Sequence, residues 1–175
     1  MYAIDERDRV VPLDDLPQSS VGAPCPLVMQ DEFTAVVAYY VEAPDPDWSG
    51  ETVRVVDPES SAEPVAIVRF RGMCAAMFGP PNDEAFHGHP LARRGLHPYS
   101  AAAIHDSSWI RILERMNSVH PHHRPEQYAR LRHFVLAFHD STFECVATGY
   151  DFVLASGPLD RLAGQMLALV REGIR

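Results

Sequence analysis

The fold of this chain is decided by the stretch Leu131-Arg-His-Phe-Val-Leu-Ala-Phe-His-Asp-Ser-Thr-Phe-Glu-Cys-Val-Ala-Thr-Gly-Tyr150. Two runs rich in phenylalanine, valine and alanine flank a short polar segment at Asp140-Ser-Thr142. This composition is typical of two antiparallel strands joined by a tight turn. The stretch therefore predicts a β-hairpin with His139, Asp140 and Glu144 gathered at its tip.

The two faces of this hairpin differ in character. With Ser141 and Thr142 as the central turn residues, successive side chains point to opposite faces. One face is apolar and predicts the protein core: Phe134, Leu136, Phe138, Phe143, Cys145 and Ala147. The other face is mixed: His133, Val135, Ala137, His139, Glu144, Val146 and Thr148. Any functional site on the hairpin therefore belongs to the mixed face.

His139 and Glu144 are expected to lie directly opposite each other on the mixed face. A carboxylate beside an imidazole fixes its tautomer and raises its basicity, which suits a general base or a metal ligand. Together with Asp140, these residues form the candidate catalytic group. The alternative is an ordinary cross-strand surface pair without a function. Ser-Thr is also not a favoured two-residue turn. A longer loop starting at Asp140 would break the pairing.

The composition is that of one acidic globular domain. A chain of 175 residues is long enough to bury a core without disulfides. Its residues are 46% hydrophobic and 22% charged, which is typical of a globular protein. The net charge is -9, and all of the positive charge is arginine. This balance argues against nucleic acid or an anionic membrane surface as a partner.

The three cysteines, Cys25, Cys74 and Cys145, are odd in number and have no C-x-x-C spacing. They form neither a disulfide framework nor a zinc-ribbon pattern. Cys74 and Cys145 stand in apolar runs, which predicts buried thiols. No apolar run approaches the length of about 18 residues that a membrane span needs, and the first residues lack the apolar core of a signal peptide. We therefore expect a cytoplasmic protein with reduced thiols.

The first half of the chain predicts an irregular segment followed by strands. Residues 1–32 are charged and then proline-rich, which indicates an extended segment packed on the domain, with Val10-Val11 as a short edge strand. Strands are predicted over residues 33–42, 51–57 and 65–78. Gly72 indicates a bulge or a break within the last of these.

Helices are expected on both sides of the hairpin. Ser100 is a candidate N-cap for a helix to about Val119, with a fresh start at Asp106 or Ser107 as the alternative. Pro125 suits the first position of a short helix over residues 126–130. After the hairpin, residues 151–155 are expected to extend its second strand. The last helix is predicted to begin at Pro158, to end at Gly173 and to bury Leu159, Leu162, Ala163, Met166 and Val170.

Together these elements predict a single α+β domain with a mainly antiparallel sheet of about five strands. The expected order is three strands, a long loop, two helices, two strands and a helix, with the helices packed on one face of the sheet. Residues 1–32 are taken as the N-terminal segment and residues 33–175 as the domain. No internal repeat or linker divides the chain.

The connection over residues 79–98 is the second candidate site, because long loops in compact domains usually carry function. His87 and His89, two residues apart, can converge on one metal ion. With the loop folded over the hairpin tip, they would bind zinc or iron together with His139 and Glu144. The candidate ligand-binding residues of the loop are Asn82, Asp83 and His97. Against a metal, histidine pairs in loops are common, and no H-E-x-x-H or paired C-x-x-C pattern is present.

No motif specifies a reaction, since the chain lacks nucleophile-elbow, dinucleotide-binding and P-loop patterns. The leading hypothesis is a small, non-catalytic cytoplasmic protein of accessory, inhibitor or immunity type that binds a partner protein or a small ligand. The alternative is a metal-assisted or histidine-based enzyme, with its site formed by the 79–98 loop and the tip of the 131–150 hairpin. An exposed strand edge or the apolar N-terminal segment would support a homodimer, although the sequence requires none.

Overall fold

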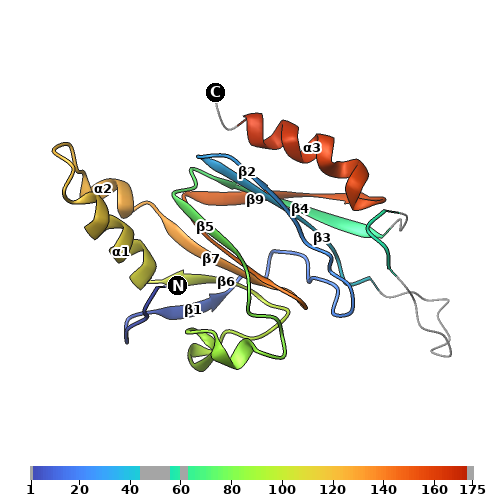
Figure 1. Ribbon diagram of the computed structural model, residues 1–175, viewed down its shortest axis with the longest axis horizontal. Helices are drawn as coiled ribbons and strands as arrows, with labels where there is room; N and C mark the ends of the chain where they lie inside the picture. Colours follow the sequence, from blue (N-terminus) through green and yellow to red (C-terminus); the bar gives the residue numbers. More distant parts are fainter. Residues whose placement is uncertain (1, 44–55, 60–62, 173–175) are drawn as a thin grey trace.

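The computed structural model describes residues 2–43, 56–59 and 63–172. Two antiparallel sheets face each other, and helices lie against their outer sides and at one end (Figure 1). The α+β class and the mainly antiparallel pairing are as the sequence predicts. The prediction of one sheet of about five strands is wrong, because the strands divide between two sheets.

The larger sheet has five strands in the order β1-β6-β7-β8-β5. Their bounds are Arg9–Pro12, Ala101–His105, Arg132–Ala137, Thr142–Ala147 and Ala75–Gly79. The second sheet has four strands in the order β2-β3-β4-β9. Their bounds are Leu27–Gln30, Thr34–Tyr40, Pro64–Arg71 and Gly149–Ser156. Every residue of β3 is buried, because this inner strand is covered on both faces.

The helices do not share one sheet face, which corrects the expectation. The α-helices are α1 (Ser108–Asn117), α2 (Pro125–Tyr128) and α3 (Leu159–Glu172). Two short 3-10 helices, η1 (Phe86–Gly88) and η2 (Ala92–Arg94), shape the long connection. Helix α3 covers the outer face of the four-stranded sheet, whereas the apolar side of α1 packs beyond the outer face of the five-stranded sheet. The two outer faces are covered differently, because α3 covers one, and the long connection together with Trp109 of α1 covers the other.

A bent two-stranded ribbon joins the sheets. Strands β4 and β9 pair up to Arg71 and Gly149, and β5 and β8 continue the pairing from Ala75 and Val146. Between these points, residues 72–74 of one strand lie opposite residues 147–148 of the other, which is one extra residue and therefore a β-bulge. The sequence predicts a bulge or a break at Gly72, and the run does divide there, at the bulge, into β4 and β5. Residues 151–155 belong to β9 in the second sheet and do not extend β8.

Three apolar clusters fill the layers. The one between the sheets contains all six residues predicted for the apolar hairpin face, from Phe134 to Ala147, and so confirms that face as core. The second lies on the outer face of the five-stranded sheet, under Trp109 and the long connection. The third lies beneath α3, where Leu159, Met166 and Val170 are buried as the stripe predicts.

The segment before α1 corrects a second expectation. Residues 101–105 form strand β6, so the start at Ser100 is wrong. The alternative start is confirmed, because the helix begins at Ser108 with Ser107 as N-cap accepting from the Ile110 N–H. The alanines of this segment favour a helix by intrinsic propensity, but they fit between β1 and β7, and tertiary pairing decides. Strand β1 is confirmed at Val10-Val11 and α2 at Pro125.

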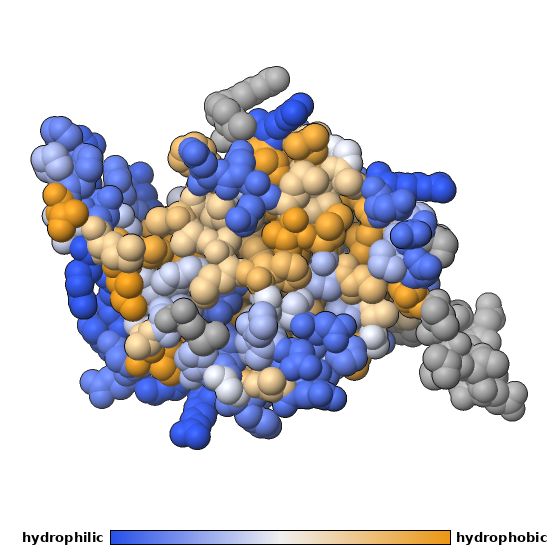
Figure 2. Space-filling view, viewed as in Figure 1, coloured by the Kyte–Doolittle hydropathy of each residue, from blue (hydrophilic) through white to orange (hydrophobic). Residues whose placement is uncertain are grey.

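Other expectations have mixed outcomes. Cys145 is buried as predicted, whereas Cys74 is exposed because it lies at the bulge, outside the regular strands. Strand β2 lies in the segment that the sequence left irregular. The strand predicted over residues 51–57 falls largely outside the described residues. The edge strands β5 and β9 expose apolar side chains, including Phe78 and Leu154. Figure 2 shows apolar surface over the middle of the molecule in this view.

Candidate functional site

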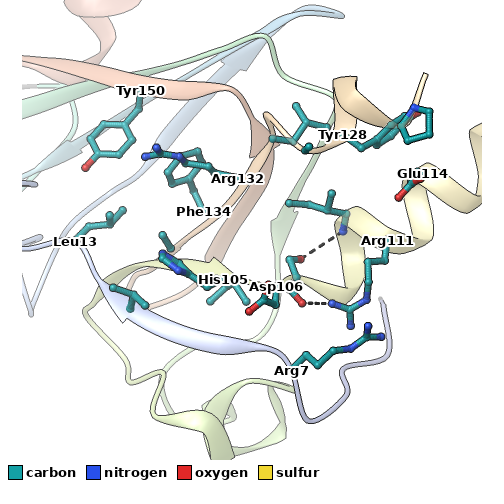
Figure 3. A pocket seen from close by; sticks show the side chains of 18 residues that line it. Arg7, Leu13, His105, Asp106, Arg111, Glu114, Tyr128, Arg132, Phe134 and Tyr150 are labelled. Atoms are coloured by element: carbon teal, nitrogen blue, oxygen red, sulfur yellow. Dashed lines mark hydrogen bonds between the residues drawn. The ribbon is translucent and has the colours of Figure 1, made fainter. Parts of the chain in front are cut away.

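A cleft of about 690 Å³ opens at the end of the sandwich where β7 begins. The inner face of β1, β6 and β7 forms its floor, and α1, α2 and the start of β9 form its walls. Figure 3 shows Arg132 and Tyr150 on one side of this space and Tyr128 and Glu114 on the other. The helical pair projects from the sheets in Figure 1, and this projection gives the cleft its far wall.

The floor of the cleft is apolar because strand register places three such side chains in one row. Val11 lies opposite Ala103, and Ala103 lies opposite Phe134. The Tyr150 ring meets the Phe134 ring edge-on at 5.3 Å between centroids and closes this side. Ile110 and Leu131 add further apolar surface to the lining.

The rim of the cleft carries charged side chains, and most of them are already paired. Asp5 accepts from Arg7 at 2.9 Å and from Arg111 at 2.7 Å. Asp106 pairs with Arg9 at 2.9 Å. These pairs leave the floor open to a ligand while they fix the N-terminal segment to α1.

A buried hydrogen-bond network centred on Glu144 lies on the opposite face of the five-stranded sheet. The Tyr2 hydroxyl donates to Glu144 Oε2 at 2.6 Å. His133 Nε2 lies 2.9 Å from Oε2, and His89 Nε2 lies 3.1 Å from Oε1. On its other side, His133 Nδ1 lies 2.9 Å from Ser107 Oγ. All five side chains are buried.

The hydrogen bonds determine which nitrogen of each neutral imidazole carries the proton. His89 Nδ1 accepts from the Leu91 N–H at 3.1 Å, so its proton is on Nε2 and points to Glu144. His133 likewise donates from Nε2 to the carboxylate, which leaves Nδ1 to accept from the Ser107 hydroxyl. Every partner of Glu144 is therefore a donor to an ionised carboxylate.

The ionisation of Glu144 follows from this arrangement. Burial alone would raise the pKa of Glu144, but the hydrogen bonds from His133, His89 and Tyr2 lower it to about 2. Burial, with the Glu144 charge beside it, raises the pKa of Tyr2, so its hydroxyl remains a donor. The network is thus a buried, ionised carboxylate held by three donors.

The order serine, imidazole, carboxylate resembles that of a nucleophilic triad, yet the geometry assigns Ser107 a structural role. The Ser107 side chain caps α1, and the residue is only 3% exposed. His133 points away from the cleft, because its strand neighbour Phe134 belongs to the cleft floor. The Asp8 carboxylate already accepts from the Ser108 N–H at 2.7 Å, so this first-turn amide is not available to an oxyanion. The network ties the N-terminus, the long connection, α1 and the hairpin together.

The predicted pairing of His139 with Glu144 is wrong, because Val135 lies opposite Glu144. The strands end at Ala137 and Thr142, so the connecting loop is longer than two residues. The carboxylate–imidazole contact that the sequence predicts does exist, but with His133, a diagonal neighbour on the same face. The prediction of which residues share the face of Glu144 is therefore correct, whereas the predicted register between the two strands is wrong.

His139 contacts the long connection at a separate place. Its Nδ1 lies 3.3 Å from Asp83 Oδ1, and the Asp83 N–H donates to the His139 carbonyl at 2.8 Å. Tyr99 donates to the other oxygen of Asp83. Burial alone would lower the pKa of His139, but the Asp83 carboxylate raises it overall. The loop thus contacts the hairpin end, which was the condition for the metal hypothesis, while Asp140 itself is exposed.

The remaining candidates of the long connection do not converge on one site. His87 and His97 are exposed, and Asn82 caps the Ala85 N–H at 3.1 Å. His89 reaches Glu144, but its Nε2 bears a proton and offers no lone pair to a metal. Among residues 2–43, 56–59 and 63–172, no three His, Cys, Asp or Glu side chains form a group that could hold a metal ion.

Sequence reasoning missed the cleft, because its lining comes from segments far apart along the chain. It also missed Tyr2 and Ser107 as members of the network. The one usable signal was the alternation that placed His133 and Glu144 on the same hairpin face.

Comparisons with protein-family models, with curated proteins and with solved structures find no match. No helix of the described part of the chain is long and apolar enough to cross a membrane. The function is therefore argued from the site alone.

Proposed function

We propose that this protein binds a small, largely apolar molecule in the cleft and performs no chemistry on it. The observation that carries the proposal is an open cleft of about 690 Å³ whose floor is the apolar row Val11, Ala103 and Phe134. Small-molecule sites are typically concave spaces of about 300–1,000 Å³ with mainly apolar and aromatic lining. The three free thiols support a cytoplasmic setting for this binding.

The cleft is held open by contacts that do not involve a ligand. Arg111 of α1 donates to Asp5 at 2.7 Å and to the Asp106 carbonyl, so the wall and the N-terminal segment are fixed to each other. The Tyr150 ring rests against Phe70 and Phe134 on the opposite side. A preformed apolar site binds more tightly than one that must be ordered by its ligand.

The histidine-based alternative has weaker support. Asp83 and His139 contact each other, but they lie at the other end of β7 from the cleft. The hollow beside Tyr99 and Phe138 has a volume of about 40 Å³, far below the roughly 300–1,000 Å³ of small-molecule sites. A substrate would find no room there, which is why the cleft is preferred.

The proposal is tested with N-phenyl-1-naphthylamine, a neutral probe whose fluorescence rises in apolar sites. Val11→Phe fills the part of the cleft floor that the exposed edge strand β1 supplies and leaves the buried core untouched. We expect saturable binding to the native protein and an affinity lower by about tenfold in Val11→Phe, which corresponds to roughly 1.4 kcal/mol.

Val119→Phe is the matched control, because it makes the same change at an exposed residue that does not line the cleft. It should bind the probe as the native protein does. Absence of saturable binding to the native protein, or equal binding by all three proteins, would contradict the proposal. Circular dichroism of each variant shows whether the fold is kept.

A further inference from the structure

The charges around the cleft specify the ligand further, and this inference rests on the proposed function. Of the arginines that line the cleft, Arg7 and Arg111 are both bound to Asp5. The lining carboxylates also have partners, since Asp106 pairs with Arg9 and Glu114 lies 3.7 Å from His123 Nε2. The paired charges therefore leave little net attraction for a ligand of either sign.

Arg132 differs from these residues. Within the described ranges it makes no ion pair and no side-chain hydrogen bond, although the chain as a whole carries a net charge of -9. Its side chain lies in the cleft beside Tyr150 and Phe134 (Figure 3). An unpaired guanidinium at the edge of an apolar site is a donor fork suited to a carboxylate, phosphate or sulfonate.

Strand geometry places this cation relative to the floor. Arg132 precedes Phe134 by two residues on β7, so both side chains lie on one face about 7 Å apart along the strand. Ile104 lies opposite His133, which makes His105 the neighbour of Arg132 on β6. His105 also lines the cleft and adds a second nitrogen-bearing side chain next to the guanidinium.

We propose that the ligand is an amphipathic organic anion, with its apolar body on the Val11–Ala103–Phe134 floor and its anionic group on Arg132. The Arg132 side chain leaves β7 about 7 Å along the strand from Phe134, so the anionic group lies beside the apolar floor and not on it. Arg132 thereby determines specificity, because it distinguishes an anion from a neutral molecule of the same shape.

Two probes that differ by one sulfonate test the inference. The anion 8-anilinonaphthalene-1-sulfonate has the aromatic skeleton of N-phenyl-1-naphthylamine plus that group. We expect the native protein to bind the sulfonate probe more tightly than the neutral one. Arg132→Gln should lower its affinity about tenfold, in line with a charge-assisted hydrogen bond, and leave the affinity for the neutral probe unchanged. Arg132→Lys should retain most of the preference, and added salt should reduce it.

Arg115→Gln is the matched control, because Arg115 is exposed on α1 and does not line the cleft. Displacement of the neutral probe by decanoate, decyl phosphate and decanol then shows whether the cleft prefers a carboxylate, a phosphate or an uncharged head group. Tighter displacement by decanoate indicates a carboxylate ligand, and tighter displacement by decyl phosphate indicates a phosphate ligand. Equal displacement by decanol and both anions would overturn the inference.

The failures of the two proposals are distinguishable. If both probes bind equally and Arg132→Gln changes neither, the anion assignment is overturned while the cleft proposal stands. If Arg132→Gln weakens both probes equally, Arg132 acts as a wall of the cleft and the anion assignment again fails. If neither probe binds the native protein, the proposed function itself fails.

Discussion

Glu144 shows how far a single residue can be predicted from the sequence. The alternation of the hairpin predicts that Glu144 shares a face with His133, Val135 and Ala137 of the facing strand. The structure confirms this face. The residue opposite Glu144 depends on the length of the turn, and the polar residues Asp140 to Thr142 do not determine that length. The other donors, Tyr2 and His89, come from 142 and 55 residues away, a separation that no local pattern can bridge.

The lowered pKa of Glu144 predicts a specific acid sensitivity. Its pKa falls from 4.5 to about 2 on folding, so its contribution to stability is present above pH 4.5 and is lost as the pH falls through 2. Glu144→Gln removes this pH dependence and lowers stability at pH 7 on the order of 2–4 kcal/mol, because an amide NH2 replaces one accepting oxygen and faces a buried donor. Urea unfolding followed by circular dichroism between pH 2.5 and 7 measures both effects.

Glu84→Gln serves as the control for this prediction, because Glu84 is exposed on the same long connection. It should follow the native protein at every pH. An acid dependence in Glu144→Gln equal to that of the native protein would show that another carboxylate is responsible.

At the scale of elements, the bent ribbon decides how the chain divides between the sheets. Gly72 is the point of this arrangement at which the sequence predicts a bulge or a break, because glycine within an apolar run indicates a bulge. The partner strand also carries a glycine at this point, Gly149, but it stands in an otherwise strand-like run that continues to Ala155, and β9 was therefore not separated from β8. The alanines of β6 were misjudged for a related reason, because strand pairing outweighed their helical propensity.

Gly72→Ala is predicted to destabilise the ribbon. Gly72 has a φ of +58°, and an added Cβ would meet Thr148 Cγ2 and Oγ1 at 2.8 Å. We expect a loss of about 1–2 kcal/mol from backbone strain, with a further loss where Thr148 cannot move. Thermal unfolding measures the effect, and Thr148→Ala in the same background should restore only the steric part.

Gly22→Ala is the matched control, because Gly22 has no atom within 4 Å of the added Cβ and no positive φ. It should leave the midpoint of unfolding within about the ±0.5 kcal/mol typical of surface substitutions. If Gly72→Ala is as stable as Gly22→Ala, the bulge tolerates a side chain and the argument from φ is wrong.

For the molecule as a whole, the composition and the hydrophobic periodicity of the sequence were sufficient to predict the fold class. They were not sufficient to predict how the strands are arranged. The sequence predicts α+β with antiparallel strands, and this is correct. The number of sheets could not be predicted, because it depends on which strands pair, and β1 with β6 or β4 with β9 are distant along the chain. The cleft could not be predicted either, since it exists only where two sheets and two helices meet.

The shared ribbon predicts that both sheets unfold together. Trp109 packs on the outer face of the five-stranded sheet, while α3 covers the four-stranded one. In Trp48→Phe, Trp109 is the single tryptophan of the chain, so its fluorescence reports on the first sheet. We expect the fluorescence and far-ultraviolet circular dichroism transitions in urea to coincide, as in two-state unfolding.

The control for this experiment is the native protein, whose circular dichroism transition should match that of Trp48→Phe. Two separated transitions would show that the sheets unfold independently, and the ribbon would then be a linker and not a shared element.

The bulge also has a mechanical consequence for the cleft. Tyr150 stands two residues beyond Thr148, and its ring closes one side of the space above Phe134. The angle of the bend therefore determines how far this ring stands from the floor. A rotation of the backbone at residues 72–74 and 147–148 would move this ring relative to Phe70 and Phe134 and so change the width of the entrance. If the proposed ligand binds in the cleft, the stiffness of a few residues at one bend sets the thickness of the molecule that can enter.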